Sequence, residues 1–210
     1  MTILTEVFIN KSKFQKMMKT KYKQTSELIS KRHTMIEMFF EYAQLKNLYR
    51  QGWLKCGITT LHCETVADHS FGVALLGYTI AEEYRPDLDS TKVMKLGLFH
   101  EMGEIYAGDV TPVDNVSIDE KVQKEFESVQ KVFSKLPDSD KYINIWLEFE
   151  YQKSAEAKFV KQIDKLELVL QADLYEKLDY KELDEFFSSV KKKIETPELK
   201  TILNDILNSR

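Results

Sequence analysis

Apolar residues recur along this sequence at intervals of three and four, and only seven glycines and four prolines interrupt the chain. Such intervals place side chains on one face of an α-helix, whereas a strand alternates at every second residue. Glycine and proline are the residues that most often end a helix, so their scarcity favours helices joined by short connections. The pattern therefore predicts an all-α protein, folded as a helical bundle.

Several helix starts can be read from capping residues. Thr65 with Asp68, and Ser117 with Glu120, have the spacing of a capping box, in which the first side chain accepts a free backbone N–H and the acid reaches back. A helix is expected to begin one residue after each of these caps. Thr196, which precedes a proline, is expected to open a final helix.

A further helix is predicted over residues 91–107. Ser90 is a suitable cap for its start, and Gly108 is suited to the left-handed conformation that ends many helices.

Length and composition set the domain organisation. With 210 residues, 43% hydrophobic and 30% charged, the chain is expected to form one domain over residues 1–210, and no repeat or Gly/Ser linker divides it. The longest apolar runs are a few residues, and no signal peptide is recognisable, which predicts a cytoplasmic protein without a membrane partner. Cys56 and Cys63 are too few for a disulfide framework and are expected to be free thiols.

Charge is distributed unevenly along the chain. Residues 1–32 hold eight Lys or Arg and two Glu, and the remainder holds 22 basic and 32 acidic residues. A basic N-terminal arm is compatible with nucleic acid, but an acidic remainder repels a polyanion. We therefore favour a basic N-terminal helix with a solvated charged face, packed on the domain, and no stable nucleic-acid partner.

The stretch "FHEMGEIYAGDVTP", residues 99–112, concentrates ionisable groups. It begins like the H-E-x-x-H helix of zinc proteases, but Glu104 stands where the second histidine is required, so that reading fails. On a helix, His100 shares its face with Gly97 and Gly103, which suggests close approach by another backbone or a ligand. Helix packing around a buried histidine is the alternative.

Two further residues are candidates for the same site. His69 shares its helix face with Gly72 and apolar residues, and is expected to point inward. Asp164 borders an apolar stripe, where a buried carboxylate needs a partner or a cation, although a solvated aspartate beside two lysines is the alternative. Together with His100 and Glu101, these residues offer two imidazoles and two carboxylates, a set suited to one divalent ion of Mn, Co, Mg, Fe or Zn.

The segments "ETVADH", "FHEMGEIYAGDVTP" and "SAEAKFVKQID" carry a family resemblance. They resemble the H…HD…D signature of HD-domain phosphohydrolases, and more narrowly their 5′-deoxynucleotidase branch. The similarity runs from about residue 39 to 180, so the resemblance implies an HD-type helical core over that range.

The resemblance also implies roles for individual residues. It implies that His69, His100, Glu101 and Asp164 hold one divalent metal ion. It implies that Glu104 deprotonates or positions the attacking water, that Asp109 assists at the leaving oxygen, and that Arg50 grips the substrate phosphate. Lys55 and Trp53 are further candidates for contact with substrate, with core packing the alternative for Trp53.

Two departures from the family pattern stand out. The family's Asp is replaced by Glu101, whose extra methylene shifts its carboxylate by about a bond length. After Trp53 the usual Arg-Asn is replaced by Lys55 and Cys56, in a loop to His69 that is about two residues longer than usual.

The predicted function is a metal-dependent 5′-deoxynucleotidase, which hydrolyses deoxynucleoside 5′-monophosphates. Two alternatives stay open: hydrolysis of a nucleoside triphosphate or another small phosphate ester, and a non-catalytic helical interaction module with a degraded site. No Gly-rich phosphate loop is present, which favours a substrate with a single phosphate. A homodimer is also expected, because the C-terminal helix carries an apolar stripe of Leu199, Ile202, Leu203 and Ile206. Docking of this stripe on the chain's own core is the alternative.

Overall fold

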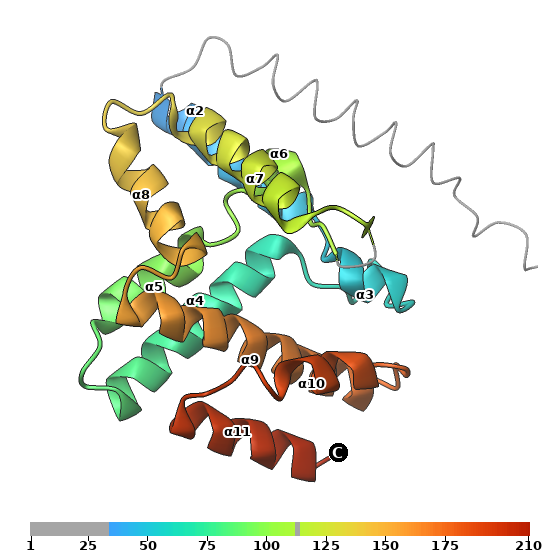
Figure 1. Cartoon of the computed structure of the whole chain (residues 1–210). Coiled ribbons are helices and arrows are strands. Elements are labelled where there is room, and N and C mark those ends of the chain that lie inside the picture. Colours follow the sequence, from blue (N-terminus) through green and yellow to red (C-terminus); the bar gives the residue numbers. More distant parts are fainter. Residues whose placement is uncertain (1–33, 112–113) are drawn as a thin grey trace, which may run out of the picture. The chain divides into compact units, whose positions relative to one another are not determined.

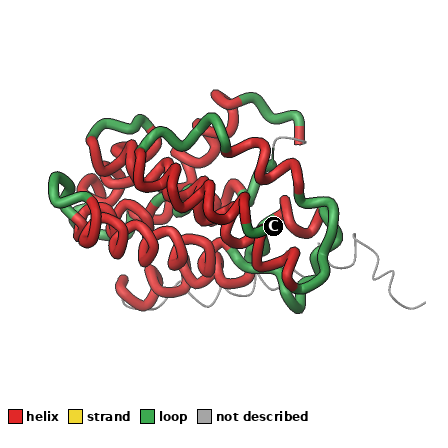
Figure 2. Tube along the Cα trace, turned by 90° about the horizontal axis from the view of Figure 1, so that it is seen from below, coloured by secondary structure: helices red, strands yellow, loops and turns green. Residues whose placement is uncertain are grey.

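The computed structural model describes residues 34–111 and 114–210. Helices and their connections make up these residues, without a β-strand among them, and one isolated bridge pairs Tyr49 with Thr65 (Figure 2). The chain divides into two units, residues 1–41 and 42–210, and each is described by itself. In the first unit the structure describes residues 34–41, which belong to helix α2 (Thr34–Tyr42). The prediction of an all-α fold is confirmed, whereas the predicted basic helix in residues 1–32 lies outside the described residues.

The other helices of the described residues lie in the second unit. In chain order they are η1 (Ala43–Asn47), a 3-10 helix, then α3 (Gln51–Lys55), α4 (Val66–Tyr84), α5 (Ser90–Phe99), α6 (Glu104–Ala107), α7 (Ile118–Phe133), α8 (Ser139–Glu150), α9 (Ala155–Lys177), α10 (Asp184–Val190) and α11 (Pro197–Asn208).

The predicted helix starts are confirmed. Thr65 and Asp68 form both halves of a capping box at the start of α4, and the Ser117 hydroxyl accepts the backbone N–H of Glu120 at 3.2 Å at the start of α7. Helix α11 begins with proline directly after Thr196. Side-chain caps therefore define the starts of α4 and α7, and a proline in the first turn marks the start of α11.

The predicted helix over residues 91–107 is wrong in its middle. Helix α5 is capped by Asp89 and not by Ser90, and it ends at Phe99. A tight turn then leads to α6. In this turn Met102 N–H donates to Phe99 O at 3.1 Å and Glu104 N–H to Glu101 O at 3.0 Å, which is the three-residue spacing of a tighter helix. The break therefore falls on the stretch that carries the candidate site. The predicted stop at Gly108 is confirmed, with a φ of 82°.

Helix α9 occupies the centre of the second unit (Figure 1). It contacts α4, α5, α8, α10 and α11. Its buried apolar side chains include Phe159, Val160, Ile163, Leu166 and Val169. Burial of each such side chain contributes roughly 1.5–3 kcal/mol to the free energy of unfolding. The helix that carries Asp164 is thus held in place by its neighbours.

Helices α4 and α5 pack closely because Gly97 has no side chain. A Cβ atom there would lie 2.7 Å from the Cα of Ala74. The absence of this atom lets the two backbones approach, as predicted for a glycine beside His100. The contact brings the end of α5 towards the beginning of α4, where His69 lies.

The apolar stripe of α11 is buried within the chain's own core. Leu199, Leu203 and Ile206 all belong to the buried core. This stripe therefore gives no support to the expected homodimer. Cys56 and Cys63 are free thiols, as predicted.

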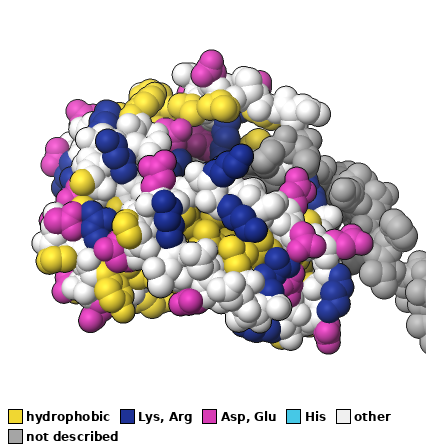
Figure 3. Space-filling model, turned by 60° about the horizontal axis from the view of Figure 1, so that its bottom comes forward, with side chains coloured by type: hydrophobic (Ala, Val, Ile, Leu, Met, Phe, Trp, Pro, Cys, Tyr) yellow, Lys and Arg dark blue, Asp and Glu magenta, His cyan; other side chains and the backbone are white. Residues whose placement is uncertain are grey.

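The exposed face in Figure 3 carries Lys and Arg side chains interspersed with Asp and Glu. Among the described residues, we find no helix with both the length and the apolar character needed to cross a membrane.

Candidate metal and phosphate site

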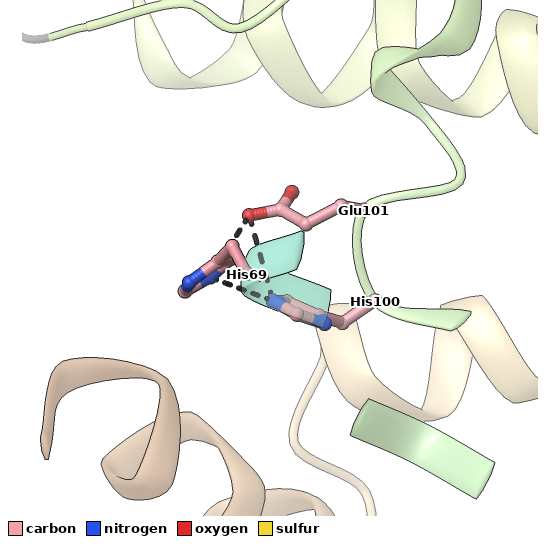
Figure 4. A group of neighbouring side chains, drawn as sticks. All are labelled: His69, His100 and Glu101. Carbon is pink, nitrogen blue, oxygen red and sulfur yellow. Dashed lines mark hydrogen bonds and ion pairs between the residues drawn. The ribbon is translucent and has the colours of Figure 1, made fainter. Parts of the chain in front are cut away.

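Three side chains from α4 and from the turn after α5 converge on one point (Figure 4). The Nε2 atoms of His69 and His100 lie 3.3 Å apart, and Glu101 Oε1 lies 3.8 Å from the first and 3.5 Å from the second. His69 is 0% exposed and His100 3%. The predicted convergence of these residues is therefore present.

The orientation of both imidazoles is fixed by their other nitrogen. His69 Nδ1 lies 2.6 Å from Glu167 Oε2, and His100 Nδ1 lies 2.7 Å from the carbonyl oxygen of Gly97. Since both partners are acceptors, each Nδ1 carries the proton and donates it. The two Nε2 atoms, the positions through which these rings can bind a metal ion, consequently face one another.

Asp164 reaches the same point from α9. Its Oδ1 atom lies 3.3 Å from His69 Nε2, and its Oδ2 atom lies 2.9 Å from the ammonium nitrogen of Lys165. Asp164 is 6% exposed. The alternative of a solvated aspartate is thus wrong, because this carboxylate is buried.

The charges at this point are strongly coupled. Burial and Arg50 act to lower the pKa of His69, but the carboxylates of Glu167 and Asp164 outweigh them and raise it to about 10. Burial lowers the pKa of His100. Burial acts to raise the pKa of Glu101, but His100 and Arg50 hold it at about 2. Glu101 is therefore ionised at neutral pH.

This donor set fits a divalent cation. The ligand atoms of His69, His100 and Glu101 all lie within 4.8 Å of one another, with the Asp164 carboxylate alongside. Two imidazole lone pairs directed at each other repel unless a proton or a cation lies between them. Mixed nitrogen and oxygen donors suit Mn²⁺, Co²⁺, Fe²⁺, Mg²⁺ and Zn²⁺.

Arg50 lies next to this cluster. One of its guanidinium nitrogens, Nη1, is 3.4 Å from Glu101 Oε1 and 3.4 Å from Asp109 Oδ1. Asp109 also accepts the backbone N–H of Gln51. Asp109 is thus an acceptor that holds Arg50 and the start of α3 in place, and the prediction that it assists at a leaving oxygen remains a prediction.

Glu104 is buried at the first position of α6, with 1% exposure. Burial, together with the charges of Glu101 and Asp109, raises the pKa of its carboxyl well above the usual range. Its Oε2 atom has no hydrogen-bond partner among the described residues. A buried carboxylate oxygen without a partner is unusual, and it is available to a proton from a small molecule.

Trp53 packs in the core instead of lining the site. It is 1% exposed, its indole N–H donates to Glu64 Oε1 at 2.7 Å, and its ring packs on Phe186 at 4.2 Å between centroids. Core packing, the alternative considered for this residue, is what the structure shows. Burial, followed by the charge of Glu167, raises the pKa of Glu64 to about 7.

Lys55 is paired with a loop residue. Its ammonium nitrogen lies 2.7 Å from each carboxylate oxygen of Asp114, and it also donates to Thr111 Oγ1 at a short distance. The exposed ammonium of Lys55 therefore already has partners in Thr111 and Asp114. The structure does not bring Lys55 into the cluster around His69.

Sequence patterns missed a second cation beside the carboxylates. Lys121 on α7 pairs with Glu125 at 3.3 Å, and its positive charge acts on both Glu101 and Glu104. Gly103 allows α7 this close, since a Cβ atom at that position would lie 2.6 Å from the Cβ of Glu125. Only the packing of α7 on the turn reveals this lysine.

Comparison with known proteins places these observations in a family. The model of the HD domain matches residues 42–206. The human protein named 5′-deoxynucleotidase HDDC2 is 34% identical over 167 residues, which are 78% of this chain and 79% of that protein. The Schizosaccharomyces pombe protein named 5′-deoxynucleotidase hdd1 is 33% identical, over 80% of this chain and 86% of that protein.

A solved structure supports the same assignment. A crystal structure of a Pyrococcus horikoshii protein superposes with a TM-score of 0.68 at 33% identity, and the match covers 83% of this chain and 96% of that one. The helices that present His69, His100 and Asp164 all lie within the matched range of the family model. The chain therefore belongs to the HD-domain family.

Proposed function

We propose that this protein is a metal-dependent 5′-deoxynucleotidase, which hydrolyses deoxynucleoside 5′-monophosphates to deoxynucleoside and phosphate. One observation carries the proposal: Glu101 Oε1 faces both histidines, at 3.5 and 3.8 Å, and also Arg50 Nη1, at 3.4 Å. A phosphate held by the guanidinium is then adjacent to the candidate metal ligands. Arginine is well suited to this task because its planar fork matches phosphate oxygens.

The four ligands in this proposal are His69, His100, Glu101 and Asp164, which together bind one divalent ion. When bound, such an ion supplies a Lewis acid that polarises a phosphoryl oxygen and lowers the pKa of water. The ion's identity, among Mn, Co, Mg, Fe and Zn, is decided by geometry, ligand type and metal availability more than by raw affinity.

Glu104 serves as the general base in this proposal. In its ionised form, Glu104 takes a proton from the attacking water on its unpartnered Oε2 atom, and its raised pKa makes this carboxylate a stronger base. The water oxygen forms the new bond to phosphorus while the bond from phosphorus to the 5′ oxygen breaks. The proton taken by Glu104 is then available to that leaving oxygen.

Two cations orient the phosphate in this proposal. Arg50 is held by Asp109 on one side, and Lys121 is held by Glu125 on the other. Both are charges that act on Glu101. Both cations are therefore close enough to Glu101 to attract a phosphate bound beside it.

The relatives support the choice of substrate class. The human and Schizosaccharomyces pombe proteins carry the name 5′-deoxynucleotidase and match about four-fifths of this chain at 34% and 33% identity. A nucleoside triphosphate or another small phosphate ester is the alternative substrate. The module with a degraded site is disfavoured, because His69, His100, Glu101 and Asp164 converge despite the change from Asp to Glu.

The test is a substrate screen with chelator-treated protein and each metal in turn. Phosphate release from deoxynucleoside 5′-monophosphates that exceeds release from ribonucleotides and triphosphates supports the proposal. Preferential cleavage of a triphosphate or of a non-nucleotide ester would establish the alternative substrate. Absence of phosphate release with every metal would establish the non-catalytic module.

The proposal also includes a homodimer and a cytoplasmic location. The family resemblance favours a dimer, but the stripe of α11 is used by the chain's own core. Light scattering at micromolar concentration tests the dimer directly, and a mass near 24.6 kDa would contradict it.

A further inference from the structure

We infer that Glu167 is the positioning residue that orients His69 for metal binding, and that Gly72 is a glycine because this carboxylate needs its space. The inference rests on the proposed metal site and extends it to residues that do not touch the metal ion. Neither residue stood out in the sequence as part of a site.

The first observation is the contact itself. Glu167 Oε2 lies 2.6 Å from His69 Nδ1, and the imidazole is fully buried. A hydrogen bond to Nδ1 fixes the tautomer with its lone pair on Nε2 and also fixes the plane of the ring. Without this hydrogen bond, the imidazole of His69 can change its tautomer or rotate, and it can then present Nδ1 instead of Nε2 to the metal site.

The second observation is that one helix contributes to both sides of the ring. Asp164 and Glu167 are three residues apart on α9 and therefore lie on the same helix face. Asp164 Oδ1 lies 3.3 Å from His69 Nε2, while Glu167 Oε2 lies 2.6 Å from Nδ1. The imidazole is thus held between two carboxylates of α9.

The third observation concerns the space around Glu167. A Cβ atom at Gly72 would lie 2.7 Å from Glu167 Oε1 and 3.3 Å from its Cγ. Even an alanine methyl at this position pushes the carboxylate away from His69. Because Gly72 is on the same helix as His69, three residues later, its missing side chain creates the opening through which Glu167 reaches the ring.

Glu64 restricts the carboxylate from another side. Ligand-capable atoms of Glu64, His69 and Glu167 all lie within 4.8 Å of one another. The Glu64 carboxylate accepts the indole N–H of Trp53 at 2.7 Å, and His69 Nδ1 already has Glu167 as its partner. We therefore assign this group to the support of His69 and not to a second metal ion.

The experiment measures Mn²⁺ binding to chelator-treated full-length protein by calorimetry, alongside the melting temperature of the metal-free protein. Four variants are compared with wild type: Glu167→Ala, Glu167→Gln, Gly72→Ala and Gly77→Ala. Gly77→Ala is the matched control, because it adds the same methyl to α4 but against an apolar contact, with Val93 Cγ1 at 2.9 Å.

The expected result is a 10–100-fold weaker Mn²⁺ affinity for Glu167→Ala and Gly72→Ala, as is typical when an outer partner of a metal-bound histidine is lost. Glu167→Gln, whose amide oxygen still accepts from Nδ1–H, should recover most of that loss. Gly77→Ala should lower the melting temperature and leave the affinity unchanged.

Three outcomes would overturn the inference. Unchanged affinity in Glu167→Ala and Gly72→Ala, with one Mn²⁺ bound, would leave the metal site intact and make Glu167 a packing residue only. Two Mn²⁺ ions in wild type and one in Glu167→Ala would make Glu167 a ligand. No Mn²⁺ binding in wild type would overturn the proposed metal site along with the inference.

Discussion

His69 and His100 direct their Nε2 atoms at each other across 3.3 Å, while the Nδ1 atom of each ring has an acceptor of its own. Two facing lone pairs in a buried site are unfavourable without a positive charge between them. Since Glu101 and Asp164 lie beside the same pair, the arrangement is that of ligands held ready for one cation.

Removal of any one of three ligands should abolish metal retention. We expect His69→Ala, His100→Ala and Asp164→Ala each to weaken Mn²⁺ binding by more than about 100-fold, beyond the loss typical of an outer partner. His62→Ala is the control, because His62 is exposed and bonded to Tyr180. Metal content by mass spectrometry is the measurement, and unchanged content in all three variants would refute the ligand assignment.

Glu104→Gln should separate metal binding from turnover. The amide fills the same buried space but accepts no proton, so kcat should fall by roughly 10²–10⁴-fold while the metal content stays at the wild-type level. Steady-state kinetics and metal analysis on one preparation test this. Loss of metal equal to that in His69→Ala would instead make Glu104 a ligand.

Glu101→Asp should lower activity, although it restores the residue usual in the family. Glu101 Oε1 already lies 3.4–3.8 Å from Arg50, His100 and His69, so a shorter side chain withdraws the carboxylate by about 1.5 Å. Deoxynucleotide hydrolysis by wild type and variant, measured side by side, decides the matter. A clear gain in the variant would mean that Glu101 marks a decayed site.

Arg50→Lys should raise KM more than it lowers kcat. Lysine keeps the charge but loses the planar fork, so KM should rise by roughly tenfold or more, equivalent to the loss of one charge-assisted hydrogen bond. Arg85→Lys is the control, since Arg85 pairs with Asp87 at the surface. An unchanged KM in Arg50→Lys would remove Arg50 from the phosphate site.

Lys121→Met tests the cation that only the packing of α7 revealed. Loss of its charge beside Glu101 and Glu104 should raise KM several-fold, with little change in metal content. Lys124→Met, on the same helix but 50% exposed and paired with Glu120, should leave KM unchanged. Equal KM values for both variants and wild type would show that Lys121 does not face the substrate.

Sequence reasoning predicted the parts of this protein that depend on local chemistry. The caps at Thr65 and Ser117 and the stop at Gly108 follow from backbone groups that a neighbouring side chain or a left-handed residue satisfies. The all-α class follows from the spacing of apolar residues. The family signature identified His69 and His100 as convergent residues before any distance was known.

The remaining features depend on contacts between segments distant in sequence. The spacing of apolar residues does not predict the break between α5 and α6. Apolar residues continue through it, whereas the backbone hydrogen bonds change to a three-residue spacing. Glu167 and Lys121 look like ordinary charged residues of amphipathic helices until α9 and α7 are packed against the site. The sequence does not indicate which way the Trp53 side chain points, because the acceptor of its indole N–H, Glu64, is brought to it only by the fold.

The proposed metal-dependent activity is tested most directly by a titration of chelator-treated wild-type protein with Mn²⁺. Bound metal and phosphate release from a deoxynucleoside 5′-monophosphate are measured on the same samples. We expect no activity without metal, and activity that rises in proportion to occupancy and stops rising at one ion per chain. Full activity in the metal-free protein, or one tightly bound ion without phosphate release, would contradict it.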